Sequence, residues 1–372
     1  MKNYFFTSES VTEGHPDKIC DKISDAILDE ALKQDKNSNM AVEATIKDDL
    51  VLIYGEANTK AKINYKDIAL RTIKKIGYTE HYNVLVKVST QSEEIHNAVN
   101  KYDAIGAGDQ GIMFGYACNE TPEYMPVAIC YANKLAKQLK KVSDKSEFLC
   151  PDGKTQVTVE YENGKFKRID TIVVSAQHIK DVKYDQLKQV IKNEVISPVV
   201  DQKFIDDKTR YLINPSGSFI KGGSFGDSGT TGRKIVCDTY GGVGRIGGGC
   251  LSSKDPTKVD RSAAYYCRYV AKNIVANNLA DKCEIQVSYA IGNSEPVSLM
   301  IDTFGTGKCS DEKILDIVHS NFDFSVSNII NELDLRKPIY EETSCYGHFG
   351  RNDLNLPWER LDKVEELKKY LK

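Results

Sequence analysis

The sequence lacks paired cysteines: its 372 residues include ten cysteines, from Cys20 to Cys345, and none are spaced as CxxC. Structural zinc sites usually group their thiolate ligands at such short spacings, so a zinc site is not expected. A long chain without a visible secretion signal is expected to keep its thiols reduced and mostly buried. We therefore predict neither a zinc centre nor a disulfide framework.

The chain also lacks a long apolar run and an excess of charge of one sign. No window approaches the roughly 20 apolar residues of a transmembrane helix, and no apolar stretch behind a basic flank marks a signal peptide. Lys and Arg number 50 against 53 Asp and Glu, a net charge of −3, which argues against a protein that coats nucleic acid or an anionic membrane. We expect a cytoplasmic protein without nucleic-acid or membrane partners, in which any positive site is local.

One order of elements, a helix, a β-hairpin and a second helix, recurs three times along the chain. Apolar residues at helical spacing predict the helices, and alternating runs joined by turn residues predict the hairpins. The pattern predicts an α+β fold of three similar units whose sheets pack together. The elements are expected at residues 16–34, 41–57 and 65–77, at 125–142, 155–178 and 184–196, and at 259–280, 284–304 and 311–322.

Glycine-rich segments lie between these units, at 106–111, 222–234 and 241–249. Two stretches, 106–111 and 242–247, match GxGxxG, but a dinucleotide-binding fold needs a helix directly after the glycines and neither is followed by one. No GxxxxGK[ST] is present, so a Walker P-loop is also unsupported. Glycines at these joints suggest loops that bring backbone close to a ligand.

Cations gather around these glycine segments. Arg233 and Lys234 end one, Arg245 lies within the next, and Lys254 and Lys258 flank Asp-Pro-Thr just before the third long helix. Any single lysine here is expected to be a solvated loop charge. The cluster, together with the backbone N–H groups of the turns, favours a phosphate-binding site.

Carboxylates accompany the cations. Asp17, Asp109, Asp227 and Asp260 each lie beside a glycine turn or a helix start, where a lone aspartate is ordinarily a helix cap. Magnesium takes one or two carboxylates plus phosphate oxygens, so the set also suits a metal–phosphate site. His15 stands two residues before Asp17 and is the histidine of greatest interest. The histidine of "YGHFGR" (346–351) is interpreted as part of a packing turn.

Five segments together resemble the S-adenosylmethionine synthetase family, which are methionine adenosyltransferases. The resemblance extends over nearly the whole chain, and "GHPDK" followed by "GAGDQG" is specific to the family. It implies three similar α+β domains around a pseudo-threefold axis, approximately residues 1–104, 105–232 and 233–372, built partly from discontinuous segments. The segments are "FTSESVTEGHPDKICDKISDAILD" (6–29), "GAGDQGIMFGYA" (106–117), "GDSGTTGRKIVCDTYGG" (226–242), "GGGCLSSKDPTKVDRSAAY" (247–265) and "CEIQVSYAIG" (283–292).

The resemblance implies that ATP, L-methionine and water are converted to S-adenosylmethionine, phosphate and diphosphate. The sulfur of methionine attacks the 5′ carbon of ATP in line and expels triphosphate, which is hydrolysed before release. Because the leaving group gathers negative charge, the reaction needs positioning and preorganised positive charge. The first step needs no general base, since the sulfur has no proton to lose.

By the same resemblance, the site residues fall into four groups. Catalytic roles are implied for His15, near the ribose 5′ oxygen, and for Lys154, Arg233, Lys234, Lys254 and Lys258. ATP contacts are implied for His15, Asp109, Asp152, Lys154, Ser218, Phe219, Asp227, Arg233, Lys234, Cys250 and Lys254, with Phe219 stacked on adenine. Methionine contacts are implied for Glu56, Gln91, Asp227 and Lys258. The metals implied are two Mg²⁺ per site, on Asp17 and Asp260, and one K⁺ per subunit, on Glu43.

Three departures from the family pattern concern the nucleotide: Ser218, Cys250 and "GGSFGD" (222–227), where the family usually has Gly-Gly-Pro. The family usually has arginine before the stacking aromatic, where this chain has Ser218, and we hypothesise that Lys221 partly replaces the missing charge. Cys250 stands where a small alanine is common. The segment from Gln91 to Asp103 resembles the family's mobile loop, which gates the site.

The resemblance further implies a homodimer or a dimer of dimers with shared active sites. Two other functions remain open from sequence. One is another ATP-dependent transferase or ligase that uses the same phosphate-binding cluster. The other is a non-catalytic regulatory subunit, which should have lost His15, Asp17 or the lysines, and this chain keeps them.

Overall fold

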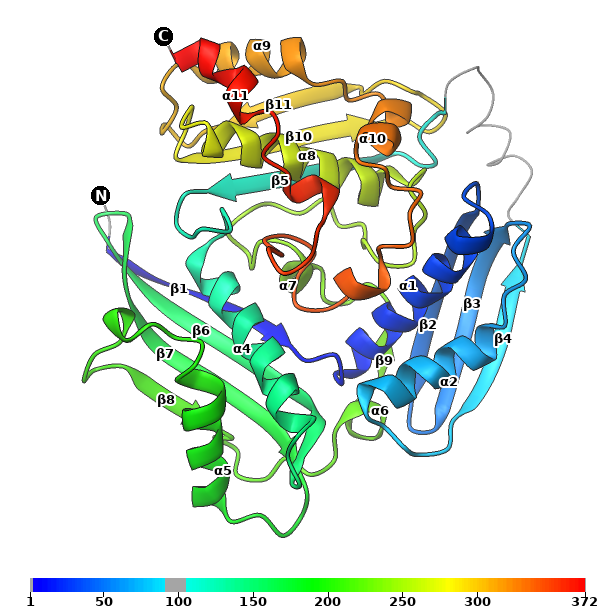
Figure 1. The fold of residues 1–372 in the computed structure, drawn as a ribbon, viewed down its shortest axis with the longest axis vertical. Coiled ribbons are helices and arrows are strands. Elements are labelled where there is room, and N and C mark those ends of the chain that lie inside the picture. The colour runs from blue at the N-terminus through cyan, green and yellow to red at the C-terminus, as the bar shows by residue number, and fades with distance from the viewer. Residues whose placement is uncertain (1–2, 91–104, 372) are drawn as a thin grey trace.

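The computed structural model describes residues 3–90 and 105–371. Its fold contains three β-sheets, each with helices packed on one face (Figure 1). The first sheet has the order β4-β3-β2-β9, the second β1-β6-β7-β8 and the third β11-β10-β5. The strands are β1 (Tyr4–Val11), β2 (Asn39–Lys47), β3 (Leu50–Asn58), β4 (Asn83–Ser89), β5 (Gly111–Cys118), β6 (Leu149–Glu162), β7 (Lys165–His178), β8 (Arg210–Ile213), β9 (Gly229–Thr230), β10 (Lys282–Tyr289) and β11 (Ser298–Asp302).

The predicted order of helix, hairpin and helix is present in all three units. The first contains α1 (Pro16–Gln34) and α2 (Tyr65–Ile76), the second α4 (Val127–Ser143) and α5 (Tyr184–Val190), and the third α8 (Val259–Ala276) and α9 (Asp311–Asn321). A π-helical turn (Ile191–Ile196) continues α5. The remaining short helices are α6 (Gly223–Gly226), α7 (Ile235–Asp238), α10 (Val326–Glu332) and α11 (Val364–Leu367).

Local signals set several of the element boundaries. Pro16 occupies the first position of α1, and the His15 ring accepts the N–H of Asp17 as a cap. Gly77 ends α2 in the left-handed conformation, with φ 117. The predicted helix over 259–280 ends earlier, at Ala276, because Asn278 turns left-handed with φ 65.

The strand that precedes the first helix of each unit pairs with the hairpin of another unit. β1 precedes α1 and pairs antiparallel with β6, β5 precedes α4 and pairs with β10, and β9 precedes α8 and pairs with β2. Each sheet therefore takes strands from two distant parts of the chain, and the three units interlock. β4 and β8 extend the first two sheets by parallel pairing with β3 and β7.

Helices, not neighbouring sheets, cover the inner faces of the sheets. α1 packs on β2, α4 on β6, and α8 on β5 and β10, and all three helices face the middle of the molecule (Figure 1). The expectation that the sheets pack against one another is therefore wrong, because the amphipathic helices bury those faces first.

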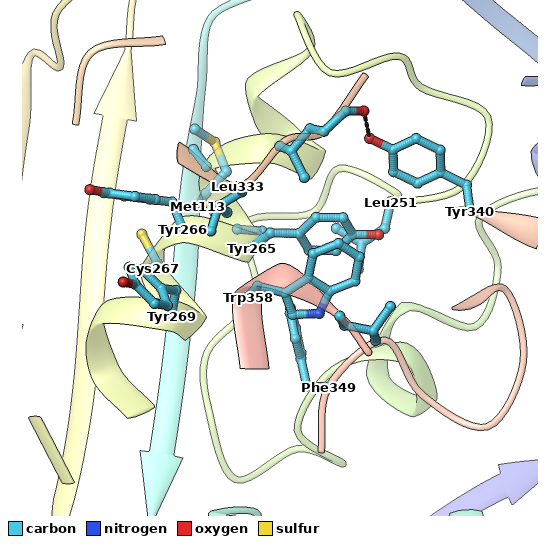
Figure 2. Packing of buried hydrophobic residues seen from close by; sticks show 14 of the residues in the cluster. Met113, Leu251, Tyr265, Tyr266, Cys267, Tyr269, Leu333, Tyr340, Phe349 and Trp358 are labelled. Atoms are coloured by element: carbon cyan, nitrogen blue, oxygen red, sulfur yellow. Dashed lines mark hydrogen bonds between the residues drawn. The ribbon is translucent and has the colours of Figure 1, made fainter. Parts of the chain in front are cut away.

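An aromatic cluster joins α8 to the C-terminal segment (Figure 2). The ring of Tyr265 stacks on fully buried Trp358, with centroids 3.8 Å apart. Trp358 Nε1 donates to the carbonyl of His348 (2.9 Å), and the His348 ring lies 2.7 Å from the Tyr265 hydroxyl. The 346–351 segment is thus a packing turn, as predicted.

All ten cysteines are free thiols, and seven of them are buried. Burial raises the pKa of Cys118, Cys130 and Cys237 to about 12. Across residues 3–90 and 105–371, no helix combines the length and apolar character needed to cross a membrane.

Candidate active site

The start of α1 holds His15 and Asp17 in a buried setting, with side chains exposed by only a few per cent. His15 Nδ1 accepts the backbone N–H of Asp17 (3.1 Å), so the neutral ring carries its proton on Nε2. Burial, together with the charges of Lys234, Lys154 and Lys18, lowers the pKa of His15 to about 3. The negative charge of Asp17 opposes this shift only in part. At neutral pH the ring is therefore uncharged and Nε2–H is its hydrogen-bond donor.

Asp17 is an anchored carboxylate. Its Oδ1 accepts the N–H of Thr230 (3.0 Å), its Oδ2 lies 2.5 Å from Lys234 Nζ, and Arg233 Nε lies 3.5 Å from Oδ1. Burial opposes ionisation of Asp17, but the bonds from Lys234 and Thr230 outweigh it and hold its pKa below the usual value. Gly229 permits this approach, since a Cβ there would lie 2.1 Å from the carbonyl oxygen of Pro16.

Strand β6 brings Asp152 and Lys154 to the same region. Lys154 is exposed and pairs with Val11, at the end of β1. Asp152 Oδ2 accepts the N–H of Gly223 (2.8 Å), whereas its buried Oδ1 has no hydrogen-bond partner among the described residues. Burial raises the pKa of Asp152 to about 6. An unpaired buried oxygen of this kind calls for a donor from a bound molecule or water.

A second set of residues surrounds the start of α8. Lys254 Nζ lies 2.5 Å from Asp260 Oδ2, and Asp260 rests against the glycine loop, since a Cβ at Gly249 would lie 2.3 Å from its Cγ. A Cβ at Gly232 would lie 2.5 Å from Cys250 Cβ. The loop that carries Cys250 and Lys254 therefore lies beside the loop that carries Arg233 and Lys234.

Lys258 and the 106–111 segment adjoin this second set. Gly108 donates its N–H to the carbonyl of Thr257 (3.1 Å), which places the glycine segment beside Lys258. Lys258 Nζ pairs with buried Asp255 (2.5 Å). Asp109 is exposed and accepts the N–H of Gln110.

Four further predicted residues make no hydrogen bond to either set in the part of the chain that the structure describes, although Glu43 lies on β2, which pairs with β9 and is bridged to Lys254 at Ala41. Phe219 is held by His178, whose Nε2 accepts its N–H (3.1 Å), and Ser218 is exposed. Glu56 is exposed near the end of β3, and Glu43 on β2 accepts a bond from the Tyr54 hydroxyl (3.2 Å). Among residues 3–90 and 105–371, no hydrogen bond or ion pair joins these side chains to either set.

Of the remaining predicted features, the structure describes Asp227 but not Gln91 or the gating segment. Asp227 is exposed, accepts the N–H of Ser228 (2.8 Å), and its charge acts on Asp152. Gln91 and the expected gating segment up to Asp103 lie outside the described residues.

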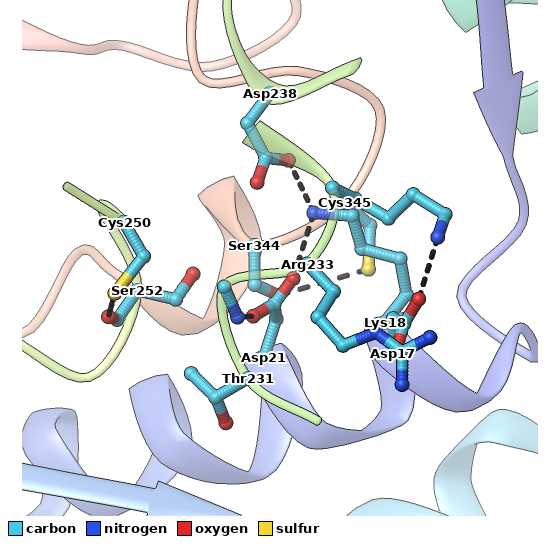
Figure 3. A network of polar contacts seen from close by, with 12 residues as sticks. Asp17, Lys18, Asp21, Thr231, Arg233, Asp238, Cys250, Ser252, Ser344 and Cys345 are labelled. Carbon is cyan, nitrogen blue, oxygen red and sulfur yellow. Dashed lines mark hydrogen bonds and ion pairs between the residues drawn. The ribbon is translucent and has the colours of Figure 1, made fainter. Parts of the chain in front are cut away.

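A buried ionic network between α1 and the segment that carries Asp238 was missed by sequence reasoning (Figure 3). Lys18 Nζ bonds to Asp21 Oδ2 (2.9 Å) and also to Asp238, and Asp25 pairs with Arg261 through two bonds of 2.8 Å. The signal that could have found it is the spacing of Asp17, Asp21, Asp25 and Asp29, which recur every four residues and so share one helix face.

Within the described ranges, no group of three or more His, Cys, Asp or Glu side chains could hold a metal by itself. Asp17 and Asp260 each offer a single carboxylate, and each is paired with a lysine. Such a site can bind a hard cation only when another molecule supplies the remaining oxygens, as phosphates do.

Paired lysines and carboxylates, a neutral histidine donor and glycine loops lie within a three-unit α+β fold, and groups of this chemistry can bind a phosphate-bearing molecule. Three domain profiles match the chain in order: S-adenosylmethionine synthetase N-terminal domain at residues 3–102, central domain at 104–219 and C-terminal domain at 221–360. The chain belongs to the S-adenosylmethionine synthetase family, the methionine adenosyltransferases, which confirms the resemblance.

Three bacterial proteins named S-adenosylmethionine synthase illustrate the relationship. That of Clostridium tetani (strain Massachusetts / E88) is 53% identical over 387 residues, covering 98% of this chain and 99% of that protein. That of Finegoldia magna (strain ATCC 29328 / DSM 20472 / WAL 2508) is 51% identical over 392 residues, covering both chains completely. That of Clostridium botulinum (strain Alaska E43 / Type E3) is 52% identical over 387 residues, covering 98% and 99%.

Proposed function

We propose that this chain makes S-adenosylmethionine from ATP and L-methionine by in-line attack of the sulfur on the 5′ carbon of ATP. The bound triphosphate is then hydrolysed to phosphate and diphosphate. The observation that carries the proposal is the group formed by neutral His15 and the anchored carboxylate of Asp17, with Arg233 and Lys234 beside them. In a chain of net charge −3, such a local gathering of cations suits an anionic leaving group.

His15 and the cations have complementary roles in this reaction. The Nε2–H of His15 donates to the ribose 5′ oxygen as its bond to carbon breaks. Lys154, Arg233, Lys234 and Lys254 neutralise the triphosphate, and fixed donors of this kind act where charge develops. The same cations serve hydrolysis, because phosphoryl transfer depends mainly on positioning and charge neutralisation.

Asp17 and Asp260 are the proposed magnesium ligands, for two Mg²⁺ per site. Their donor sets fit, because magnesium accepts one or two carboxylates and completes its shell with phosphate oxygens and water. Bound magnesium would neutralise phosphate charge. Glu43, a partly buried carboxylate on β2, is the proposed K⁺ ligand, with one ion per subunit.

The remaining contacts divide between nucleotide and amino acid. Asp152 supports a substrate contact best, because its buried Oδ1 lacks a partner within the described part of the chain. Lys258 is proposed to act on methionine and in catalysis. The other proposed ATP contacts are Asp109, Ser218, Phe219, Asp227 and Cys250, and the other proposed methionine contacts are Glu56, Gln91 and Asp227.

At the level of the fold, we propose that a pseudo-threefold axis relates domains near 1–104, 105–232 and 233–372. The cyclic exchange of β1, β5 and β9 among the sheets supports this symmetry. We also propose a homodimer or a dimer of dimers that shares active sites. Exposed apolar side chains on the third sheet, Ile112 and Met300 among them, support self-association. We also propose that the protein is cytoplasmic.

Incubation of the pure protein with ATP, L-methionine, Mg²⁺ and K⁺, followed by mass spectrometry, tests the function. We expect S-adenosylmethionine together with phosphate and diphosphate. Cleavage of ATP to ADP would instead indicate another ATP-dependent transferase or ligase. A well-folded protein that binds ATP and yields no product would indicate a regulatory subunit.

A further inference from the structure

One face of α1 contacts three different segments of the C-terminal half of the chain through aspartates four residues apart. Side chains at this spacing are neighbours on a helix surface. Asp21 and Asp25 are fully buried, and Asp29 is nearly so. Each of the three accepts backbone N–H groups from a different segment, which makes a comparison between them informative.

Asp21 holds the segment that carries two of the proposed phosphate-binding cations. Its Oδ1 accepts the N–H of Gly232 (2.8 Å), and its Oδ2 accepts from Lys18 Nζ (2.9 Å). Gly232 directly precedes Arg233 and Lys234. Asp21 therefore holds the backbone directly before both cations, next to the point where β9 pairs with β2.

Asp25 holds the neighbouring segment in the same way. Its Oδ1 accepts the N–H of Ser253 (3.0 Å), the residue directly before Lys254. Arg261 pairs with both oxygens of Asp25 at 2.8 Å, and its Nη1 also donates to the carbonyl of Lys254 (3.1 Å). Ser253 adopts a left-handed φ of 79, a conformation that is costly for a non-glycine residue and needs such support.

We propose that Asp21 and Asp25 are positioning residues for the triphosphate: they fix the loops that present Arg233, Lys234 and Lys254. This inference rests on the proposed function. Gly232 and Cys250 are in close approach, so the two loops form one surface, and α1 sets both halves of it. Preorganised cations stabilise developing charge without rearrangement, and loss of either anchor removes that preorganisation.

Asp29 offers a matched control on the same helix face. It accepts N–H groups from Tyr340 (3.0 Å) and Glu341 (2.9 Å). Neither residue, nor the segment around them, carries a proposed site residue. Asp29 thus makes the same kind of contact, at the same spacing, but the segment that it holds carries no proposed phosphate-binding cation.

The test compares Asp21→Asn, Asp25→Asn and Asp29→Asn. An amide supplies one acceptor oxygen where the carboxylate supplies two, so each variant loses at least one of the hydrogen bonds that the carboxylate accepts, while the side-chain shape is kept. Calorimetry measures the affinity for inorganic tripolyphosphate with Mg²⁺ and the melting temperature of each, and kinetics measures KM for ATP and kcat. We expect all three variants to melt at lower temperature. Only Asp21→Asn and Asp25→Asn should bind tripolyphosphate roughly tenfold more weakly, with Asp29→Asn within about twofold of the parent.

The inference is overturned if the three variants lose affinity equally, if none loses it, or if the losses simply follow the melting temperatures. An Asn variant that fails to fold is replaced by Asp→Glu at the same three positions, which keeps the charge beside Lys18 and Arg261 and displaces the carboxylate, with the same order expected. Absence of S-adenosylmethionine from the parent protein refutes the proposed function alone, because tripolyphosphate binding is read separately. A parent protein that does not bind tripolyphosphate overturns the inference.

Discussion

Each proposed magnesium ligand is paired with a lysine proposed to bind phosphate, and this pairing predicts that metal and triphosphate bind together. Asp17 pairs with Lys234 and Asp260 with Lys254, both at 2.5 Å. Magnesium alone must displace a lysine from its carboxylate and leave that lysine without a partner. Bound triphosphate would supply oxygens both to pair with the lysine and to complete the shell of a magnesium ion held by the carboxylate.

The structure sets the size of the effect. Both pairs are largely shielded, with side chains exposed by 19% at most. A hydrogen bond to a charged group contributes about 1.5–3 kcal/mol. Displacing one lysine should therefore weaken magnesium binding by about ten- to one-hundred-fold per site. Because coupling is reciprocal, magnesium should strengthen tripolyphosphate binding by the same factor.

Calorimetric titration of Mg²⁺, with and without tripolyphosphate, measures this coupling in the parent and in Lys234→Met and Lys254→Met. The variants keep the aliphatic stem and lose the charge, so we expect tighter binding of Mg²⁺ alone and weaker binding of tripolyphosphate. Lys47→Met is the matched control, because Lys47 pairs with Asp48 at an exposed hairpin turn. The reasoning fails if the parent binds Mg²⁺ equally well without tripolyphosphate, or if the variants leave Mg²⁺ affinity unchanged.

Three further predictions concern stability, the nucleotide and a thiol. Glu359→Ala leaves two buried cations of α8 unpaired and should cost about 3–5 kcal/mol, seen as a lower melting temperature that exposed Glu365→Ala does not share. Lys221→Ala should raise KM for ATP if Lys221 replaces the missing arginine, and an unchanged KM refutes that idea. Iodoacetamide should label Cys150, Cys250 and Cys309, which are partly exposed. An unreactive ATP mimic should protect Cys250 alone, as read by peptide mapping, and equal labelling of Cys250 with and without the mimic would contradict the proposed contact.

Elements whose boundaries depend on local chemistry could be predicted from the sequence. Pro16 set the start of α1, Gly77 the end of α2, and Asn163-Gly164 the tight turn between β6 and β7, where φ values of 53 and 77 suit these residues. The gathering of cations around the glycine segments was also readable, because Arg233, Lys234 and Arg245 lie in or beside them and Lys254 and Lys258 follow Gly249 by five and nine residues.

Contacts between distant segments could not be predicted in this way. Nothing in the composition of β1, β5 or β9 indicates which sheet each joins, since backbone pairing is the same for any strand of suitable length. The bond from Gly232 to Asp21 and the pair formed by Lys234 and Asp17 likewise depend on where the chain folds back. The four-residue spacing of aspartates on α1 indicated a polar helix face, but it did not indicate which residues these aspartates would contact.

The two GxGxxG matches have a structural role in this chain that differs from dinucleotide binding, the function usually associated with this motif. A Cβ at Gly106 would lie 2.4 Å from the carbonyl oxygen of Gly292, and a Cβ at Gly247 would lie 1.7 Å from that of Ile112. Both glycines let one segment of the chain approach another closely. Packing between segments therefore explains one glycine in each GxGxxG match, Gly106 in the first and Gly247 in the second. That requirement needs no helix after the glycines, and neither match opens one: 106–111 leads into β5, and 242–247 leads into the Cys250 loop. The cations beside these loops, rather than the glycines themselves, therefore carry the case for phosphate binding.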